Sequence, residues 1–215
     1  MNVQTATPVR KIGVFGGAFD PPHKAHVVLA SVAIEALGLD ELRIIPTGQA
    51  WHKARRLSEP GHRLAMTRLA FENMRSVVVD SREMERIGPS FTIDTLRELQ
   101  SENPDARLYL VMGADQFAAF RQWHEWQSII GLAIICIAAR AGIDWASSSF
   151  DAYQVQKDRF LTIPMPAINV SATRIRQLLA CENAPGSDIF ATLTELVTEP
   201  VARYISHHRL YTVAT

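Results

Sequence analysis

A strand, a turn and a helix near the start of the chain constrain the fold more than any other stretch. Residues 13–26 read GVFGGAFDPPHKAH: an apolar strand over Lys11 to Phe15 ends at two glycines, and an Asp-Pro-Pro turn leads into a helix. Backbone without a Cβ lets N–H groups approach an anion, and the positive end of a helix points to the same place. His23 and His26 are three residues apart, so they share one face of that helix. The stretch predicts a phosphate site that carries two imidazoles.

Other kinds of site fit this stretch less well. In a Walker P-loop counted from Gly17, Pro22 and His23 occupy the positions of the required Gly and Lys. The glycines at 13, 16 and 17 do not make the G-x-G-x-x-G of a dinucleotide-binding fold. Zinc-binding histidines on a helix are more often four residues apart with a Glu between them. A glycine-rich turn with two histidines that bind nothing is the remaining alternative.

Composition limits the class of protein. The chain has 215 residues, is 47% hydrophobic and contains no low-complexity tract, which predicts one globular domain over 1–215 with an ordered core at about 10–211. The formal net charge of zero argues against a general binder of nucleic acid or of anionic membranes. The apolar run over 131–139 is too short to cross a membrane.

The first residues and the cysteines indicate a cytoplasmic protein. Residues 1–9 have no apolar core, so we expect no signal peptide. Cys136 lies in an apolar run and Cys181 near the end of a predicted helix, and neither belongs to a metal-binding spacing. Both are expected to be reduced thiols.

Apolar runs and helical patterns alternate along the chain. This alternation predicts a doubly wound, Rossmann-like, mostly parallel α/β sheet with a helical C-terminal part, whose ligands gather beyond the carboxyl ends of the strands. The predicted strands are Lys11–Phe15, Arg43–Pro46, Val77–Val79, Arg107–Met112, Leu132–Ala138 and a possible sixth, Phe160–Ile163. One predicted helix begins at Val27, and a further one follows residues 111–117. The others cover Gly61–Met74, Phe91–Leu99, Ser171–Cys181, Ile189–Val197 and Val201–His208.

Residues 16–26 resemble the signature of a known superfamily. Their sequence, GGAFDPPHKAH, is similar to the GGTFDPxHxGH of the nucleotidylyltransferases, which also gives class I aminoacyl-tRNA synthetases their His-x-Gly-His. Ala18 replaces the usual Thr or Ser and removes a hydroxyl donor. Ala25 replaces the usual Gly and places a methyl where backbone normally approaches the nucleotide.

Further segments narrow the resemblance to bacterial nicotinate-mononucleotide adenylyltransferases. Residues 88–96, GPSFTIDTL, are similar to the family's Pro-Ser-Tyr-Thr-x-Asp-Thr-Leu, and residues 113–123 to its Gly-Ala-Asp…Trp segment. Residues 169–176, NVSATRIR, resemble an Ile-Ser-Ser-Thr-x-Ile-Arg motif, and residues 201–211 resemble the family's C-terminal ending. The resemblance therefore runs over about 11–211.

Without the resemblance, several of these residues have ordinary structural explanations. Ser90 or Thr92 is simply a helix N-cap. Trp123 is more often a core residue, and Ser171 is a good N-cap. Thr173 and Arg176 then share a helix face beside that N-terminus, which suits a polyphosphate.

Two basic residues match the family only in part. Residues 46–56, PTGQAWHKARR, read as a solvated basic loop, but they partly resemble the family's Pro-Asn…Pro-His-Lys loop, in which the Lys meets phosphate. Lys53 is therefore a candidate phosphate contact. Arg140 resembles the Arg of an Arg-Pro-Gly turn, with Ala141 in place of Pro.

The resemblance implies adenylyl transfer from ATP to nicotinate mononucleotide, giving nicotinate adenine dinucleotide and pyrophosphate. The acceptor phosphate is already an anion, so no general base is needed, in keeping with the absence of a Ser/His/Asp or paired-carboxylate motif. His23 and His26 are the predicted catalytic residues, acting on the α-phosphate oxygens. Mg²⁺ is expected to arrive with ATP, without a metal site built from protein side chains. The predicted ATP-binding residues are Gly16, Gly17, Phe19, His23, His26, Gly113, Asp115, Ser171, Thr173 and Arg176. The predicted mononucleotide-binding residues are Lys53, Thr92, Trp123 and Arg140.

Several alternatives stay open at this point. The acceptor could be nicotinamide mononucleotide or phosphopantetheine, and the departures at Ala18 and Ala25 leave room for a nucleotide sensor without activity. A tRNA-binding, synthetase-like protein is disfavoured by the chain's short length and neutral charge. The sequence does not fix the oligomeric state, and a homo-oligomer is among the options.

Overall fold

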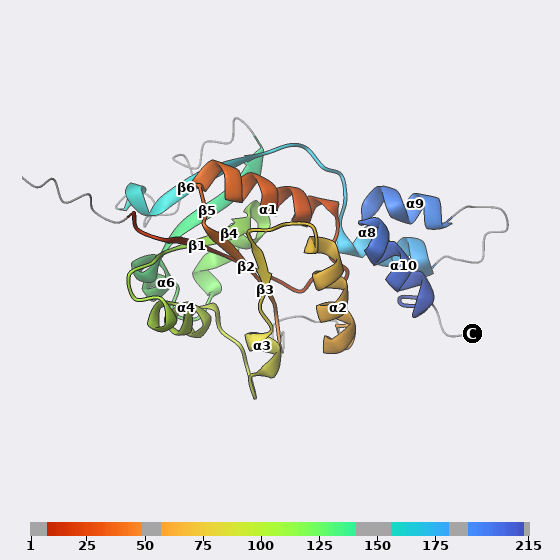
Figure 1. Cartoon of the computed structure of the whole chain (residues 1–215), viewed down its shortest axis with the longest axis horizontal. Coiled ribbons are helices and arrows are strands. Elements are labelled where there is room, and N and C mark those ends of the chain that lie inside the picture. The colour runs from red at the N-terminus through yellow and green to blue at the C-terminus, as the bar shows by residue number, and fades with distance from the viewer. Residues whose placement is uncertain (1–7, 49–56, 141–155, 181–188, 213–215) are drawn as a thin grey trace, which may run out of the picture.

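The structure is a computed structural model, and it describes residues 8–48, 57–140, 156–180 and 189–212. Its centre is a six-stranded sheet in the order β3-β2-β1-β4-β5-β6, with every neighbouring pair parallel (Figure 1). The strands are β1 (Lys11–Gly17), β2 (Glu41–Pro46), β3 (Val77–Val79), β4 (Arg107–Gly113), β5 (Ala133–Arg140) and β6 (Phe160–Met165). The predicted Rossmann-like fold and its six strands are thus confirmed.

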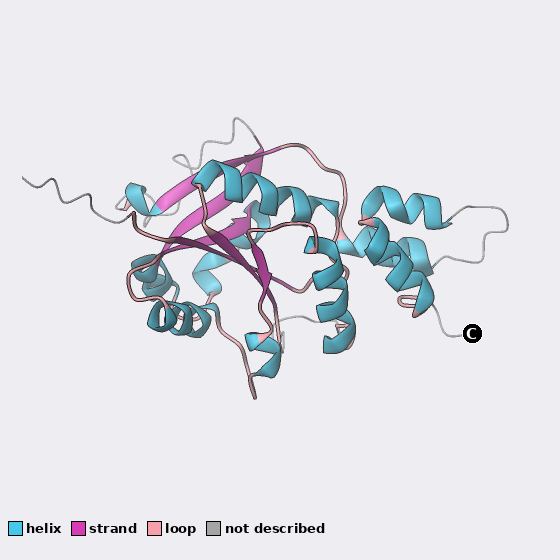
Figure 2. Ribbon diagram, viewed as in Figure 1, coloured by secondary structure: helices cyan, strands magenta, loops and turns pink. Residues whose placement is uncertain are grey.

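Helices connect the strands and cover both faces of the sheet (Figure 2). They are α1 (Lys24–Leu37), α2 (Pro60–Phe71), α3 (Arg82–Glu85), α4 (Thr92–Glu102), α5 (Ala114–Ala118), α6 (Trp126–Leu132), α8 (Ala172–Ala180), α9 (Ile189–Leu196) and α10 (Glu199–His207), with single 3₁₀ turns η1 (Phe120–Gln122) and η3 (Lys157–Arg159). No helix in the described ranges is both long and apolar enough to span a membrane.

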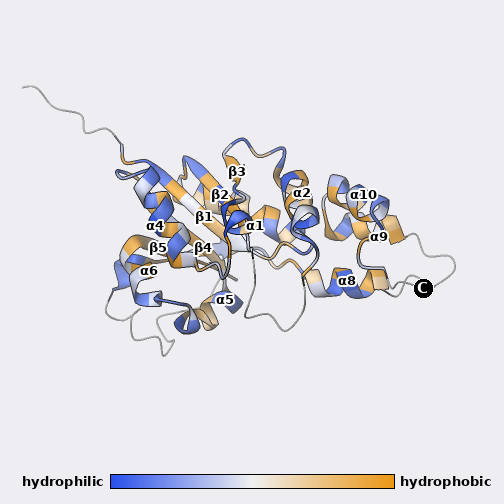
Figure 3. Ribbon diagram, turned by 90° about the horizontal axis from the view of Figure 1, so that it is seen from below, coloured by the Kyte–Doolittle hydropathy of each residue, from blue (hydrophilic) through white to orange (hydrophobic). Residues whose placement is uncertain are grey.

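Two separate cores lie on the two faces of the sheet. One joins α1 and α2 to the C-terminal helices, and Leu29, Met66 and Leu193 are fully or almost fully buried in it. The other packs α4, α5 and α6 on the opposite face, around Leu96 and Phe117. Most helices are banded orange and blue in Figure 3, as expected where one side packs inward and the other meets water. The C-terminal helices are therefore part of a core that contains the first helix of the chain.

Some boundaries and caps of the observed elements differ from the predicted ones. The helix predicted over Gly61–Met74 ends at Phe71. The strand predicted from Leu132 begins at Ala133, because α6 leads into β5 through one continuous apolar run that shows no boundary. The predicted N-cap at Ser90 or Thr92 is wrong, since Phe91 is the N-cap residue and Thr92 is the first helical residue. The short helices α3 and α6 were not predicted.

Candidate functional site

The candidate site lies where the strand order reverses. Strands β1 and β4 are neighbours in the sheet, but the chain first moves outward from β1 to β3 and returns to β4 on the other side. In open α/β sheets, ligands bind at this point, beyond the carboxyl ends of the strands. Gly16 and Gly17 end β1, and Gly113 ends β4. The first motif and the Gly-Ala-Asp motif are thereby brought to the same edge of the sheet.

The two predicted histidines are stacked on each other at the start of α1. Their ring centroids are 3.7 Å apart with an interplanar angle of 20°. His23 is the N-cap residue, and its backbone N–H donates to Nδ1 of His26 over 3.1 Å. Because a backbone N–H can only donate, Nδ1 of neutral His26 carries no proton, and Nε2 carries it instead. His26 therefore presents an N–H donor at Nε2.

His23 is buried and neutral. Its side chain is 9% exposed, and its Nδ1 is a buried atom without a hydrogen-bond partner in the described part of the chain. Burial lowers the pKa of His23 to about 4, although a backbone hydrogen bond partly opposes the shift. Buried polar atoms without a partner are rare in folded proteins, and a catalytic role or a bound ion is among their explanations. His23 is therefore a candidate for hydrogen bonding to an oxygen atom of a ligand.

The glycines at the end of β1 leave different amounts of space. A Cβ at Gly16 would have nothing nearer than the Ile45 carbonyl at 4.0 Å, whereas one at Gly17 would lie 3.0 Å from the Phe19 ring. Phe19 itself is buried, has a positive φ of 45° and packs edge-on against His26 at 5.0 Å. Its side chain supports the histidine pair, so only its backbone is available to a ligand.

Helix α8 reaches the same place from the other end of the chain. Ser171 caps it, accepting the backbone N–H of Arg174 at 3.2 Å as predicted. Arg176 donates through Nη2 to Thr173 Oγ1 at 3.1 Å, which confirms that these two side chains share a face. Nη1 of Arg176 donates to the carbonyl of Asp20 over 2.6 Å, across 156 residues of sequence. We call residues 16–26, with Ser171, Thr173 and Arg176, the histidine side of the site.

A buried polar cluster under the histidine side was missed by the sequence analysis. Asp20 is 2% exposed and accepts the hydroxyl of Tyr211 at 2.7 Å and the backbone N–H of Ser58 at 3.2 Å. Burial, reinforced by Asp20, raises the pKa of Tyr211, so its hydroxyl stays a donor. Arg63 lies nearby and is 1% exposed. The signal was present in the sequence, since Arg63 interrupts the apolar face made by Met66 and Ala70 at helical spacing.

Gly113 and Asp115 lie beside the histidine side, at the start of α5. Gly113 is the N-cap residue, and Asp115 is exposed in the first turn of the helix. A Cβ at Gly113 would come within 2.6 Å of Oδ1 of Asp115, so the carboxylate lies directly over the glycine. Gln116 donates to the other oxygen of Asp115 at 3.3 Å.

A second group of side chains, the aromatic side, comes from the start of α4 and the segment after η1. Phe91 and His124 are in contact, with ring centroids 4.4 Å apart and ring planes tilted by 36°. Thr92 and Trp123 are their neighbours in the sequence. Trp123 is half-buried and packs edge-on against Phe120 at 5.4 Å. The aromatic side comprises Pro89, Phe91, Thr92, Gln122, Trp123 and His124.

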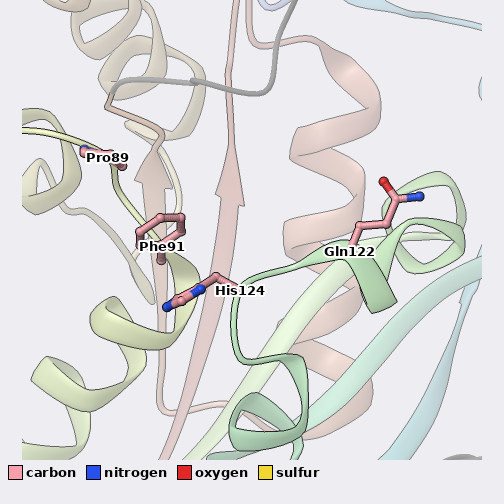
Figure 4. Close-up of a pocket in the computed structure, with 4 residues that line it drawn as sticks. All are labelled: Pro89, Phe91, Gln122 and His124. Atoms are coloured by element: carbon pink, nitrogen blue, oxygen red, sulfur yellow. The ribbon is translucent and has the colours of Figure 1, made fainter.

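A pocket of about 390 Å³ opens in the aromatic side. It is lined by Pro89, Phe91, Gln122 and His124. Figure 4 shows Phe91 and His124 facing each other, with Gln122 set apart from them. The pocket is of the size that small-molecule sites commonly have.

Of two further predicted residues, the structure describes one by its backbone alone and the other not at all. Lys53 falls outside the described residues. Arg140 is the last residue of β5, where its backbone is in register with Met165 of β6. The ligand-binding role predicted for Arg140 stays a prediction.

Sequence comparisons place the chain among known proteins. The profile of the cytidylyltransferase-like family matches residues 14–178. A protein of Albidiferax ferrireducens, described as "Probable nicotinate-nucleotide adenylyltransferase", is 52% identical over 206 residues, which are 96% of this chain and 100% of that protein. A protein of Methylibium petroleiphilum with the same description is 43% identical over 206 residues, which are 96% of this chain and 94% of that protein.

Solved structures agree with the fold. Nicotinic acid mononucleotide adenylyltransferase of Plasmodium falciparum, in a structure complexed with NaAD, superposes with a TM-score of 0.71 at 19% identity. The match covers 94% of this chain and 97% of the other. At this level of identity the likeness supports the Rossmann-like architecture.

Proposed function

Because this chain belongs to the nicotinate-nucleotide adenylyltransferase family, we propose that it transfers the adenylyl group of ATP to nicotinate mononucleotide. The products are nicotinate adenine dinucleotide and pyrophosphate. The observation that carries the proposal is the stacked pair of His23 and His26 at the start of α1, which follows the glycines that end β1 where the strand order reverses.

The reaction needs alignment and charge stabilisation rather than proton removal. The phosphate of the mononucleotide attacks the α-phosphorus of ATP, and the bond from that phosphorus to the bridging oxygen of pyrophosphate breaks. The attacking oxygen is already anionic, so no general base takes part. Transfers of this type depend on positioning and on neutralising the oxygens around phosphorus.

We assign the histidine side to the triphosphate. The Nε2–H of His26 and the imidazole of His23 donate to α-phosphate oxygens, whose negative charge must be stabilised during transfer. The backbone of Gly16 to Phe19 surrounds phosphate, and the N-terminus of α1 adds its dipole. Ser171, Thr173 and Arg176 hold the leaving pyrophosphate, with Arg176 exchanging its Asp20 carbonyl contact for phosphate.

The remaining predicted residues divide between adenosine and the acceptor. Gly113 and Asp115 bind adenosine. Thr92, Lys53 and Arg140 bind the mononucleotide, and Trp123 stacks on its pyridine ring.

Mg²⁺ enters this scheme with ATP. Within the described residues, no group of three His, Cys, Asp or Glu side chains is arranged to hold a metal ion. Magnesium keeps several waters and uses substrate phosphates as ligands, so the protein is suited to a metal held by the nucleotide. When bound there, the ion neutralises charge on the phosphates.

The proposal is tested by pyrophosphate release. Purified protein is incubated with ATP–Mg²⁺ and, in separate reactions, nicotinate mononucleotide, nicotinamide mononucleotide or phosphopantetheine. We expect the largest kcat/KM with nicotinate mononucleotide. A preference for another acceptor would mean that the aromatic side binds that acceptor instead of nicotinate mononucleotide. ATP binding without pyrophosphate release in any of the three reactions would indicate a nucleotide sensor.

A further inference from the structure

Arg63 is a buried cation whose side chain donates to backbone carbonyls. Its side chain is 1% exposed, and it forms no ion pair with any residue the structure describes. Burial lowers its pKa, while the nearby carboxylate of Asp20 acts in the opposite direction. Burying a guanidinium is costly unless its donors are satisfied. The use of those donors is therefore the feature to explain.

Among the described residues, the hydrogen bonds that Arg63 donates all go to backbone carbonyls, and these belong to three different segments. Nη1 donates to Ala18 O at 3.0 Å and to Thr47 O at 2.8 Å, and Nη2 approaches Gly48 O at 3.4 Å. Nε donates to Ser58 O at 3.1 Å. Ala18 belongs to the loop after β1, and Thr47 and Gly48 follow β2 directly. One guanidinium thus ties together two loops at the carboxyl edge of the sheet.

These contacts fix the direction of two peptide groups. In a trans peptide the C=O and the N–H point in opposite directions. Because the Ala18 carbonyl points at Arg63, the N–H of Phe19 points away from it. The same reasoning applies to the Thr47 carbonyl and the N–H of Gly48. In the described part of the chain, neither of these N–H groups has a hydrogen-bond partner.

We infer that Arg63 is a positioning residue that orients the backbone donors of Phe19 and Gly48 toward the anionic ligand. The inference rests on the proposed function, since it assigns a role within that nucleotide site. The flat fork of the guanidinium is suited to this task, because it holds several carbonyls in one plane. The ammonium of a lysine has three donors on one atom and cannot span the same carbonyls.

The test compares Arg63→Lys and Arg63→Ala with the control Arg68→Lys. Arg68 lies on the same helix but is exposed. All proteins are assayed well below their melting temperatures, with folding verified by circular dichroism. For Arg63→Lys we expect the Kd for ATP to rise about tenfold, as for one lost hydrogen bond to a charged group. Millimolar guanidinium should partly restore ATP affinity in Arg63→Ala and have no such effect on the wild type.

The possible outcomes separate a positioning role from a purely structural one. Wild-type ATP affinity in folded Arg63→Lys would overturn the inference. The inference would also be overturned if the loss of activity in both variants were proportional to their unfolded fraction. The same holds if neither variant folded even with ATP and guanidinium present. Failure of the proposed function is recognised independently, because the wild-type protein would then release no pyrophosphate.

Discussion

The two sides of the site differ in how firmly they are built. On the histidine side, His23, Asp20 and the supporting Arg63 are at most 9% exposed, and hydrogen bonds link Asp20 and Arg63 to segments far apart in the sequence. Ser171 and Thr173 of the same side are exposed. On the aromatic side, Gln122 and His124 are exposed and Trp123 is half-buried. The contrast fits a reaction in which the phosphates must be aligned before transfer, while the acceptor must enter and leave. Changes on the histidine side should therefore affect kcat, and changes on the aromatic side should affect KM.

The largest effect is expected for His26→Ala. Losing one preorganised donor to a developing charge costs about 2.7–4 kcal/mol of barrier, so kcat should fall about 10²–10³-fold. Binding of ATP, measured by calorimetry, should weaken far less. His207→Ala, which changes an exposed histidine on α10, serves as the control and should leave both quantities unchanged. Near-normal turnover in His26→Ala would remove this residue from the mechanism.

The burial of His23 predicts a pH-dependent stability. Its pKa is about 4 in the folded chain against 6.5 for an unperturbed histidine, so between these values the unfolded chain binds a proton that the folded chain does not. The contribution of His23 to the free energy of unfolding should therefore be constant above pH 6.5 and decrease as the pH falls toward 4, with a loss on the order of 2 kcal/mol at pH 5. Urea titrations at pH 7.5 and 5 should show a smaller loss for His23→Gln. Equal losses in both proteins would contradict a buried, neutral His23.

Substitutions at two glycines of β1 should distinguish a residue that a ligand approaches from a residue that packs in the core. Gly16 has room for a methyl group, whereas a Cβ at Gly13 would lie 2.5 Å from Leu39 Cδ1 and 2.6 Å from Leu42 Cδ1. Gly16→Ala should keep the melting temperature and raise the KM for ATP about tenfold, because the methyl occupies space that phosphate needs. Gly13→Ala should lose about 1–3 kcal/mol of stability by overpacking and keep its KM. The reverse pattern would mean that ATP does not approach Gly16.

The same contrast explains what the sequence could predict. The apolar runs of β1, β4 and β5 and the Ser171 cap are local signals, and the structure agrees with them. The bond between Arg176 and the Asp20 carbonyl, and the one between Tyr211 and Asp20, join residues 156 and 191 positions apart. No periodicity carries such information, because periodicity reports only which residues share a face of one helix or strand.

The aromatic side was predictable only as two separate segments. Thr92 and Trp123 stood out by resemblance, but nothing in the sequence indicated that their neighbours Phe91 and His124 form a ring contact. The predicted N-cap residue at the start of α4 was wrong for a related reason. Ser90 donates its hydroxyl to the Glu83 carbonyl instead, so tertiary contact took precedence over local capping preference.

The smallest effect is expected for Trp123→Ala, and it tests the aromatic side directly. Stacking between aromatic rings contributes about 0.5–1.5 kcal/mol, so the KM for nicotinate mononucleotide should rise about fivefold while kcat changes less than about twofold. Trp126→Ala is the matched control, because both tryptophans pack edge-on against Phe120, with ring centroids 5.4 Å away for Trp123 and 6.3 Å for Trp126. The control should lose stability without a change in KM. If Trp123→Ala instead lowered kcat with KM unchanged, the acceptor ring would be part of the aligned transfer geometry, and the two sides of the site would not divide binding from catalysis.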